Sequence, residues 1–247
     1  MYAWKCWRDS RLRFIAYLTV VVALPINVVL TPALRYQGEA GWALLRDSSS
    51  IFAKEITHSA FAGFAGLGLL LIALASMAMG ASGVGDEFKH GSLEFLLTRP
   101  RRRKHFIWVA WGIGALQMMA MIALSAVVVF SLVYYLTRGM ALWRLFGMAG
   151  VLLVAALVCL GLSYFGTVWI RDARNGLAIA VVAALAYAIV SALLETKWRI
   201  QLPSFIDLLR SVADRDRPFK FELLAGWIAF ALACPLLAQW VFDRRDV

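Results

Sequence analysis

The chain has 247 residues, of which 62% are apolar and 16% are charged, and its formal net charge is +10. A soluble domain carries about 25% charged residues, so this composition excludes an ordinary soluble globular domain. Long runs without Asp, Glu, Lys or Arg have the length that a helix needs to cross a bilayer, about 20 residues. We therefore expect an all-α polytopic membrane protein with a single six-span transmembrane domain over residues 1–247.

The N-terminal residues 1–13 mix tryptophans with cations. Trp4, Trp7 and Arg11 fall at helical spacing, which is typical of a short interfacial helix that lies in the headgroup layer. A basic flank with interfacial tryptophans, directly before the first span, explains the same residues equally well.

Apolar runs predict the six spans. They cover residues 14–30, 59–81, 106–136, 145–170, 177–194 and 223–242. The first contains Pro25 and Asn27, and the third contains Gln117. Because polar and helix-breaking residues are costly against lipid, these three are candidates for lining a passage.

The positive charges predict the orientation. Lys and Arg are more frequent on the side that carries both termini, and the basic block at residues 101–104 directly adjoins a span. Basic residues of this kind stay in the cytoplasm, so we expect both termini there. The same placement beside spans explains the net charge without a nucleic-acid partner.

The last outer loop contains a second predicted helix. Ser204 is placed to cap it, and Phe205, Leu208, Leu209 and Val212 share one face. Such a helix lies on the outer leaflet or folds over the mouth of a passage. Periodicity alone favours the position on the leaflet.

The spans lack the residues that most membrane chemistry needs. No charged residue lies well inside them, which disfavours ion-coupled transport. Ser163 has no base to activate it, so we expect it to pack helices rather than act as a nucleophile. Without acid–base residues, an intramembrane enzyme is disfavoured as well.

Cofactor and metal sites are not expected either. Met118, Met119 and Met121 point in different directions on a helix, which favours packing over copper(I) binding. The three cysteines, two of them in apolar runs, do not indicate a disulfide framework. No phosphate-binding loop is present, so the chain is not expected to hydrolyse ATP itself.

Residues 85–104 form a mixed-charge stretch between two predicted spans. Acidic residues and a cluster of cations surround an apolar face of Leu93, Leu96 and Leu97. A loop that grips anionic headgroups accounts for the cations. It does not account for the acidic residues or the leucine face, which indicate a docking surface for a protein in the water.

The stretch resembles the motif that follows the second span in permease subunits of the ABC type-2 transporter family. The residues that carry the resemblance are Glu87, Gly91, Ser92, Leu93, Glu94, Leu96, Leu97, Pro100 and Arg103. The chain departs from the family at Val109 and Ala110, where many members have glycine and lysine.

The resemblance implies a coupling helix that docks into a groove of a separate ATP-hydrolysing subunit. Leu93, Leu96 and Leu97 would fill the groove, and the rim would be formed by Glu87, Glu94, Arg101, Arg102 and Arg103. ATP and Mg²⁺ would bind to that partner, and no cofactor would bind to this chain. A second permease protomer, identical rather than different, would complete a multi-pass exporter in the cytoplasmic membrane of a prokaryote.

Two further expectations concern the transported cargo and an alternative function of the chain. An uncharged lining suits a hydrophobic or amphiphilic cargo better than an ion. The alternative is a membrane assembly factor or scaffold that uses the same stretch to dock a cytoplasmic partner without transport.

Overall fold

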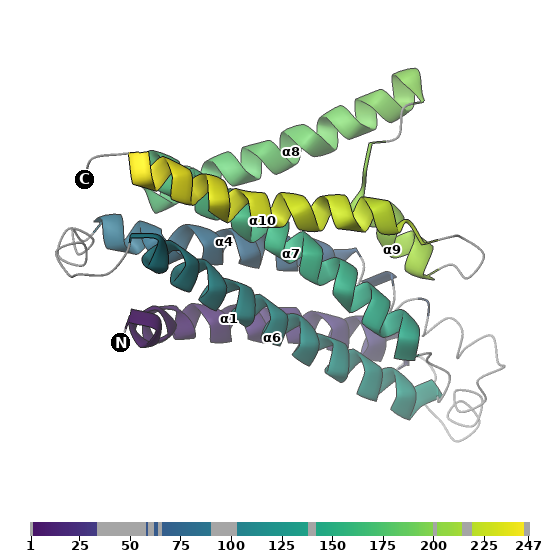
Figure 1. Ribbon diagram of the computed structural model, residues 1–247. Helices are drawn as coiled ribbons and strands as arrows, with labels where there is room; N and C mark the ends of the chain where they lie inside the picture. Colours follow the sequence, from purple (N-terminus) through teal and green to yellow (C-terminus); the bar gives the residue numbers. More distant parts are fainter. Residues whose placement is uncertain are drawn as a thin grey trace.

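The described chain is built from long apolar helices, because in a bilayer a helix satisfies every backbone polar group within one segment. The computed structural model describes residues 2–33, 58, 62–63, 66–89, 103–137, 142–199, 202–213 and 219–244. Within these ranges every regular element is a helix, which confirms the all-α class (Figure 1). The helices are α1 (Tyr2–Ala33), α4 (Leu67–Lys89), α6 (Arg103–Thr137), α7 (Leu142–Ile170), α8 (Ala173–Trp198), α9 (Phe205–Ala213) and α10 (Phe221–Arg244).

Four of these helices are long and apolar enough to cross a membrane. The qualifying segments are His105–Leu136, Arg144–Ile170, Ala173–Trp198 and Phe221–Arg244. They correspond to the third, fourth, fifth and sixth predicted spans. In α4 the apolar part, Leu67–Ser82, is shorter than these four. The four long apolar helices support a membrane protein. Helices α1 and α4 are not among the four, and they pack against them.

Helix α7 occupies the centre of the bundle. It contacts α4, α6, α8, α9 and α10, while α1 lies against α4 and α6 (Figure 1). Its side chains Leu152, Ala156 and Leu160 are almost completely buried in the main apolar core. The position of α7 therefore determines how the other helices are held.

The first two predicted spans differ from the helices observed. Residues 2–13 and the predicted span 14–30 belong to one helix, α1, which runs from Tyr2 to Ala33, so a separate interfacial helix is not confirmed. Helix α4 begins at Leu67 and continues to Lys89, whereas the predicted second span was residues 59–81. Past residue 81 the buried Gly85 lets α4 run close to α7 and α8, because a Cβ atom added there would lie only 2.5 Å from Cβ of Ala173 and 3.0 Å from Cγ2 of Thr167.

Helix α8 is the least buried of the four long apolar helices. The side chain of Asp172 accepts a hydrogen bond of 3.0 Å from the backbone nitrogen of Arg174 and so caps its first turn. Arg199, in the left-handed conformation with φ of 56°, ends it. Figure 1 shows α8 running away from α10 and α7 toward its C-terminal end, and apolar side chains such as Ile189 and Leu193 are exposed there.

The predicted outer helix is present as α9. Ser204 Oγ accepts a hydrogen bond from the backbone nitrogen of Ile206 at 3.1 Å, which confirms the expected cap. Leu208, Leu209 and Val212 are buried in the main core, so the apolar face of α9 packs against α7. The favoured position, with that face on the outer leaflet, is therefore wrong.

Candidate functional site

The motif that resembles the permease family lies between α4 and α6. Glu87 is in the last turn of α4 and Arg103 is the first residue of α6. The remaining motif residues lie outside the described part of the chain: Gly91, Ser92, Leu93, Glu94, Leu96, Leu97, Pro100 and Arg101. The structure therefore describes only the two outermost residues of the motif, one in α4 and one in α6. We use the name motif end for the part of the bundle where α4 ends and α6 begins.

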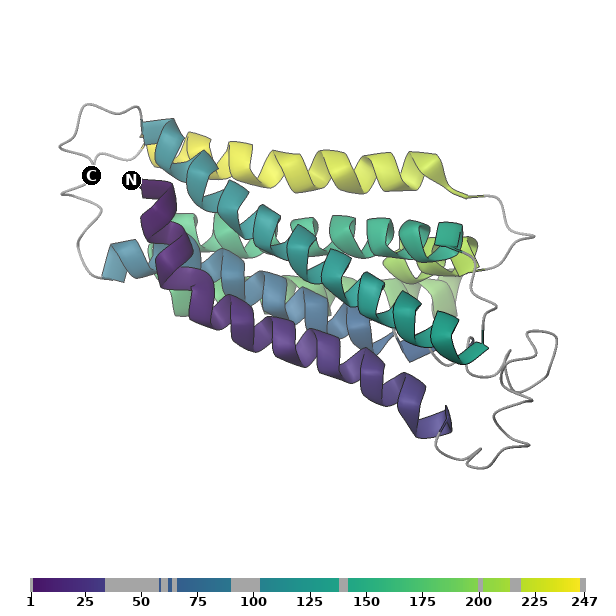
Figure 2. The same cartoon turned by 90° about the horizontal axis from the view of Figure 1, so that it is seen from below.

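Both termini of the helical chain also lie at the motif end. Figures 1 and 2 show the start of α1 and the end of α10 beside the end of α4 and the start of α6. The two ends of the described chain and the helix ends that flank the motif therefore lie at one end of the bundle.

Two neighbouring residues of α7 hold the helices on either side of the motif. Ser163 Oγ donates a hydrogen bond of 2.6 Å to the backbone oxygen of Met77 in α4. The Tyr164 hydroxyl donates one of 3.0 Å to the backbone oxygen of Ile107 in α6. All four residues are buried, so water does not compete for these bonds. The expectation that Ser163 packs helices rather than reacts agrees with this contact.

Close approach of the backbones tightens the contact of α4 with α7. A Cβ atom added at Gly80 would lie 2.5 Å from the backbone oxygen of Leu160 and 3.2 Å from Cβ of Ser163. Only glycine fits there, and small residues at such positions allow helices in membranes to pack closely. The end of α4 that leads to Glu87 is thus seated directly on α7.

The start of α6 is anchored a second time, on α10. Trp108 Nε1 donates a hydrogen bond of 2.8 Å to Gln239 Oε1. Around it an apolar cluster joins three helices, with Ile107 from α6, Tyr164 from α7, and Ala238 and Phe242 from α10. These contacts hold the start of α6, directly after the motif, against α7 and α10.

The three candidate lining residues are not brought together. Asn27 is exposed, and its side-chain oxygen accepts a hydrogen bond of 3.0 Å from Thr31 on the same helix. Gln117 is only 2% exposed and faces α1, where its Nε2 donates to Ser10 Oγ at 2.7 Å. Pro25 lies within α1, and its side chain is outside what the structure describes. A shared lining by Asn27 and Gln117 within one protomer is therefore not observed.

The chemistry of the described residues is that of packing and hydrogen bonding. Among them no group of three His, Cys, Asp or Glu side chains is placed to hold a metal ion. Met118 and Met121 are fully buried, in agreement with the expected packing role, whereas Met119 is 48% exposed. Cys6, Cys159 and Cys234 are not joined to one another by disulfide bonds.

Sequence reasoning did not identify Tyr164, Trp108 or Ser10 as structural contacts. Polar groups inside the apolar runs were the available signal, since Gln117 and Gln239 each needed a partner. Which partner each one finds depends on the packing of helices far apart in the sequence.

Comparison of the chain with known protein families and with curated proteins finds no match. The assignment of a function therefore depends on the motif residues and on the way the helices on either side of them are held.

Proposed function

We propose that this chain is the membrane-spanning permease subunit of an ATP-driven exporter of the ABC type-2 class. In this proposal α1 and α4 cross the membrane together with the four long apolar helices, which makes six spans with both termini in the cytoplasm. The chain binds no cofactor, and ATP and Mg²⁺ bind to a separate ATPase subunit. Two identical protomers in the cytoplasmic membrane of a prokaryote form the route for a hydrophobic or amphiphilic cargo.

One observation carries the proposal most strongly. The motif residues between Glu87 and Arg103 connect two helices that α7 grips through Ser163 and Tyr164. A partner that pushes on the motif would exert force on both helices. Through them the force would reach α7, the central helix of the bundle. Rigid-body movement of packed helices is an established way to convert a local contact into alternate access.

The chemistry of the motif supports a protein partner rather than lipid alone. The spacing of its leucines in the sequence would give a short helix one apolar face to fill a groove, while Glu94 and Glu87 would be repelled by anionic headgroups. Acidic and basic residues around an apolar centre are the usual composition of the rim and core of a protein–protein interface.

Co-purification tests the proposal. The chain would be co-expressed with a candidate phosphate-loop ATPase, and the complex would be isolated from membranes. We expect Leu96→Asp and Glu94→Arg to abolish co-purification, because a buried unpaired charge or a reversed rim charge opposes docking. Retained binding with full ATP turnover in both variants contradicts the proposal.

Matched controls lie at the opposite end of the bundle. Ile206 on α9 and Glu195 on α8 are exposed, so Ile206→Asp and Glu195→Arg repeat the same chemical changes away from the motif. Both controls are expected to leave the complex intact. The complex can also form through the motif while the presence of this chain changes neither the ATP turnover of the ATPase nor transport. That result identifies the scaffold function instead.

A further inference from the structure

Helix α1 changes direction in its N-terminal part. Figure 2 shows its first turns inclined to the remainder of the helix, which follows the bundle. We call residues 2–9 the N-terminal segment. It carries Lys5 and Arg8 and exposes Trp4, which is 66% exposed. A bend in a helix needs an identifiable local cause.

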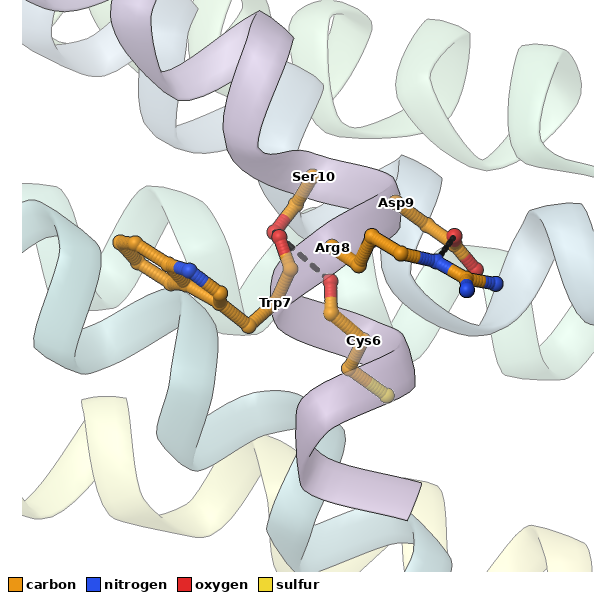
Figure 3. Close-up of polar contacts among 5 residues, drawn as sticks. All are labelled: Cys6, Trp7, Arg8, Asp9 and Ser10. Carbon is orange, nitrogen blue, oxygen red and sulfur yellow. Dashed lines mark hydrogen bonds and ion pairs between the residues drawn. The ribbon is translucent and has the colours of Figure 1, made fainter. Parts of the chain in front are cut away.

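Ser10 supplies such a cause. Its hydroxyl donates to the backbone oxygen of Cys6 at 2.8 Å and also lies 3.2 Å from that of Trp7 (Figure 3). A serine that bonds back to the preceding turn competes with the helix hydrogen bonds and often bends the helix. The pair of Arg8 and Asp9, 3.6 Å apart, is exposed and contributes little.

The contact with α6 distinguishes Ser10 from other back-bonding residues. Thr19 makes the same kind of bond, to the backbone oxygen of Ile15 at 2.9 Å, further along α1. Ser10 Oγ in addition accepts a hydrogen bond of 2.7 Å from Nε2 of the buried Gln117. Because the oxygen is engaged by Gln117, the hydroxyl proton is directed to the backbone of α1.

Packing around this bond is loose. A cavity of about 40 Å³ lies among α1, α4 and α6, and its wall includes Ser10, Gln117, Ser82 and Met79. This volume is close to that of one water molecule, about 30 Å³ in the liquid. Beside this cavity the Ser10–Gln117 bond is a direct polar link between α1 and α6, in addition to the packing of Cys6 against the apolar cluster of α6, α7 and α10.

We infer that Gln117 is a positioning residue that sets the angle between the N-terminal segment of α1 and α6 through Ser10. Because α6 begins at Arg103, directly after the motif, a shift of α6 carries the basic N-terminal segment with it. The inference concerns the isolated chain and does not depend on the identity of any partner or cargo.

Distance measurement between two spin labels tests the inference. Labels at Trp4 and Val127, which are 66% and 59% exposed, lie on opposite sides of the Ser10–Gln117 bond. The purified full chain, with its three cysteines replaced by alanine, would be measured in lipid nanodiscs without a partner. Loss of a kink of about 20° over the roughly 9 Å from Trp4 to Ser10 moves the label by about 3 Å.

We expect Ser10→Ala and Gln117→Ala to broaden the distance distribution and to shift its mean by about 3 Å. Ser10→Thr keeps the hydroxyl and should retain the distribution of the unsubstituted chain, because the hydroxyl is the group that bonds to Gln117 and to the backbone. Thr19→Ala removes a back-bond without a partner residue on α6 and should also leave it unchanged. Unchanged distributions in both alanine variants, or the same shift in Thr19→Ala, overturn the inference.

Discussion

The hydroxyl of Tyr164 on α7 lies 3.0 Å from the backbone oxygen of Ile107, four residues after the start of α6. The preceding residue, Ser163, makes the equivalent contact with α4 at 2.6 Å. One turn of α7 therefore bonds both to α4, which precedes the motif, and to α6, which follows it. This arrangement resists separation of the two helices, so that a load on the motif reaches α7.

Removal of the Tyr164 hydroxyl tests this contact. Tyr164→Phe keeps the buried ring and deletes one hydrogen bond, so the free energy of unfolding should fall by about 1 kcal/mol. The measurement is unfolding of the purified chain by SDS in mixed micelles. Tyr135→Phe is the control, because Tyr135 is 74% exposed and should show no change. Equal effects of the two substitutions would argue against a structural role for the bond.

The close contact of α4 with α7 predicts a strong effect of one added methyl group. Gly80→Ala places a carbon 2.5 Å from the backbone oxygen of Leu160, which cannot move away without shifting α7. Such overpacking costs about 1–3 kcal/mol. Thermal unfolding in detergent should show the loss.

Gly112 provides the matched comparison. It also lies within a long helix, α6, but an added Cβ meets no atom within 4 Å. Gly112→Ala should be neutral or should stabilise the protein by up to about 1 kcal/mol, because alanine is the better helix former. A greater loss at Gly112 than at Gly80 would contradict the described packing.

The burial of α9 gives a third prediction. Leu208 is fully buried, whereas Ile206 on the same helix is 52% exposed. Leu208→Ala should lower the free energy of unfolding by about 2–5 kcal/mol, because it leaves a cavity in the core. Ile206→Ala should change it little. If the two variants lose equal stability, α9 does not pack on α7 by this face.

Apolar runs predicted four of the helices well. The spans expected at 106–136, 145–170, 177–194 and 223–242 lie within α6, α7, α8 and α10, since bilayer thickness and hydropathy determine the length of such segments. The cap of α9 by Ser204 was likewise predictable, because it depends on neighbouring residues alone.

Other features depend on tertiary contacts that hydropathy does not contain. Helix α4 continues beyond residue 81 to Lys89, where Gly85 allows it to approach α7 and α8 closely. Gln117 was expected to line a passage, but its partner proved to be Ser10, a residue 107 positions away in the chain. A polar residue in a span indicates that a partner exists, and only the packing of the helices identifies it.

Site-directed photo-crosslinking at the motif tests the central claim most directly. A photoreactive amino acid in place of Leu97 would be activated in membranes that contain this chain and the candidate ATPase. The account predicts a covalent adduct whose mass equals that of the two subunits together, and no adduct from the same probe in place of Ile206. Absence of the adduct from position 97 in an intact complex, or equal adducts from both positions, would contradict docking of the ATPase on the motif.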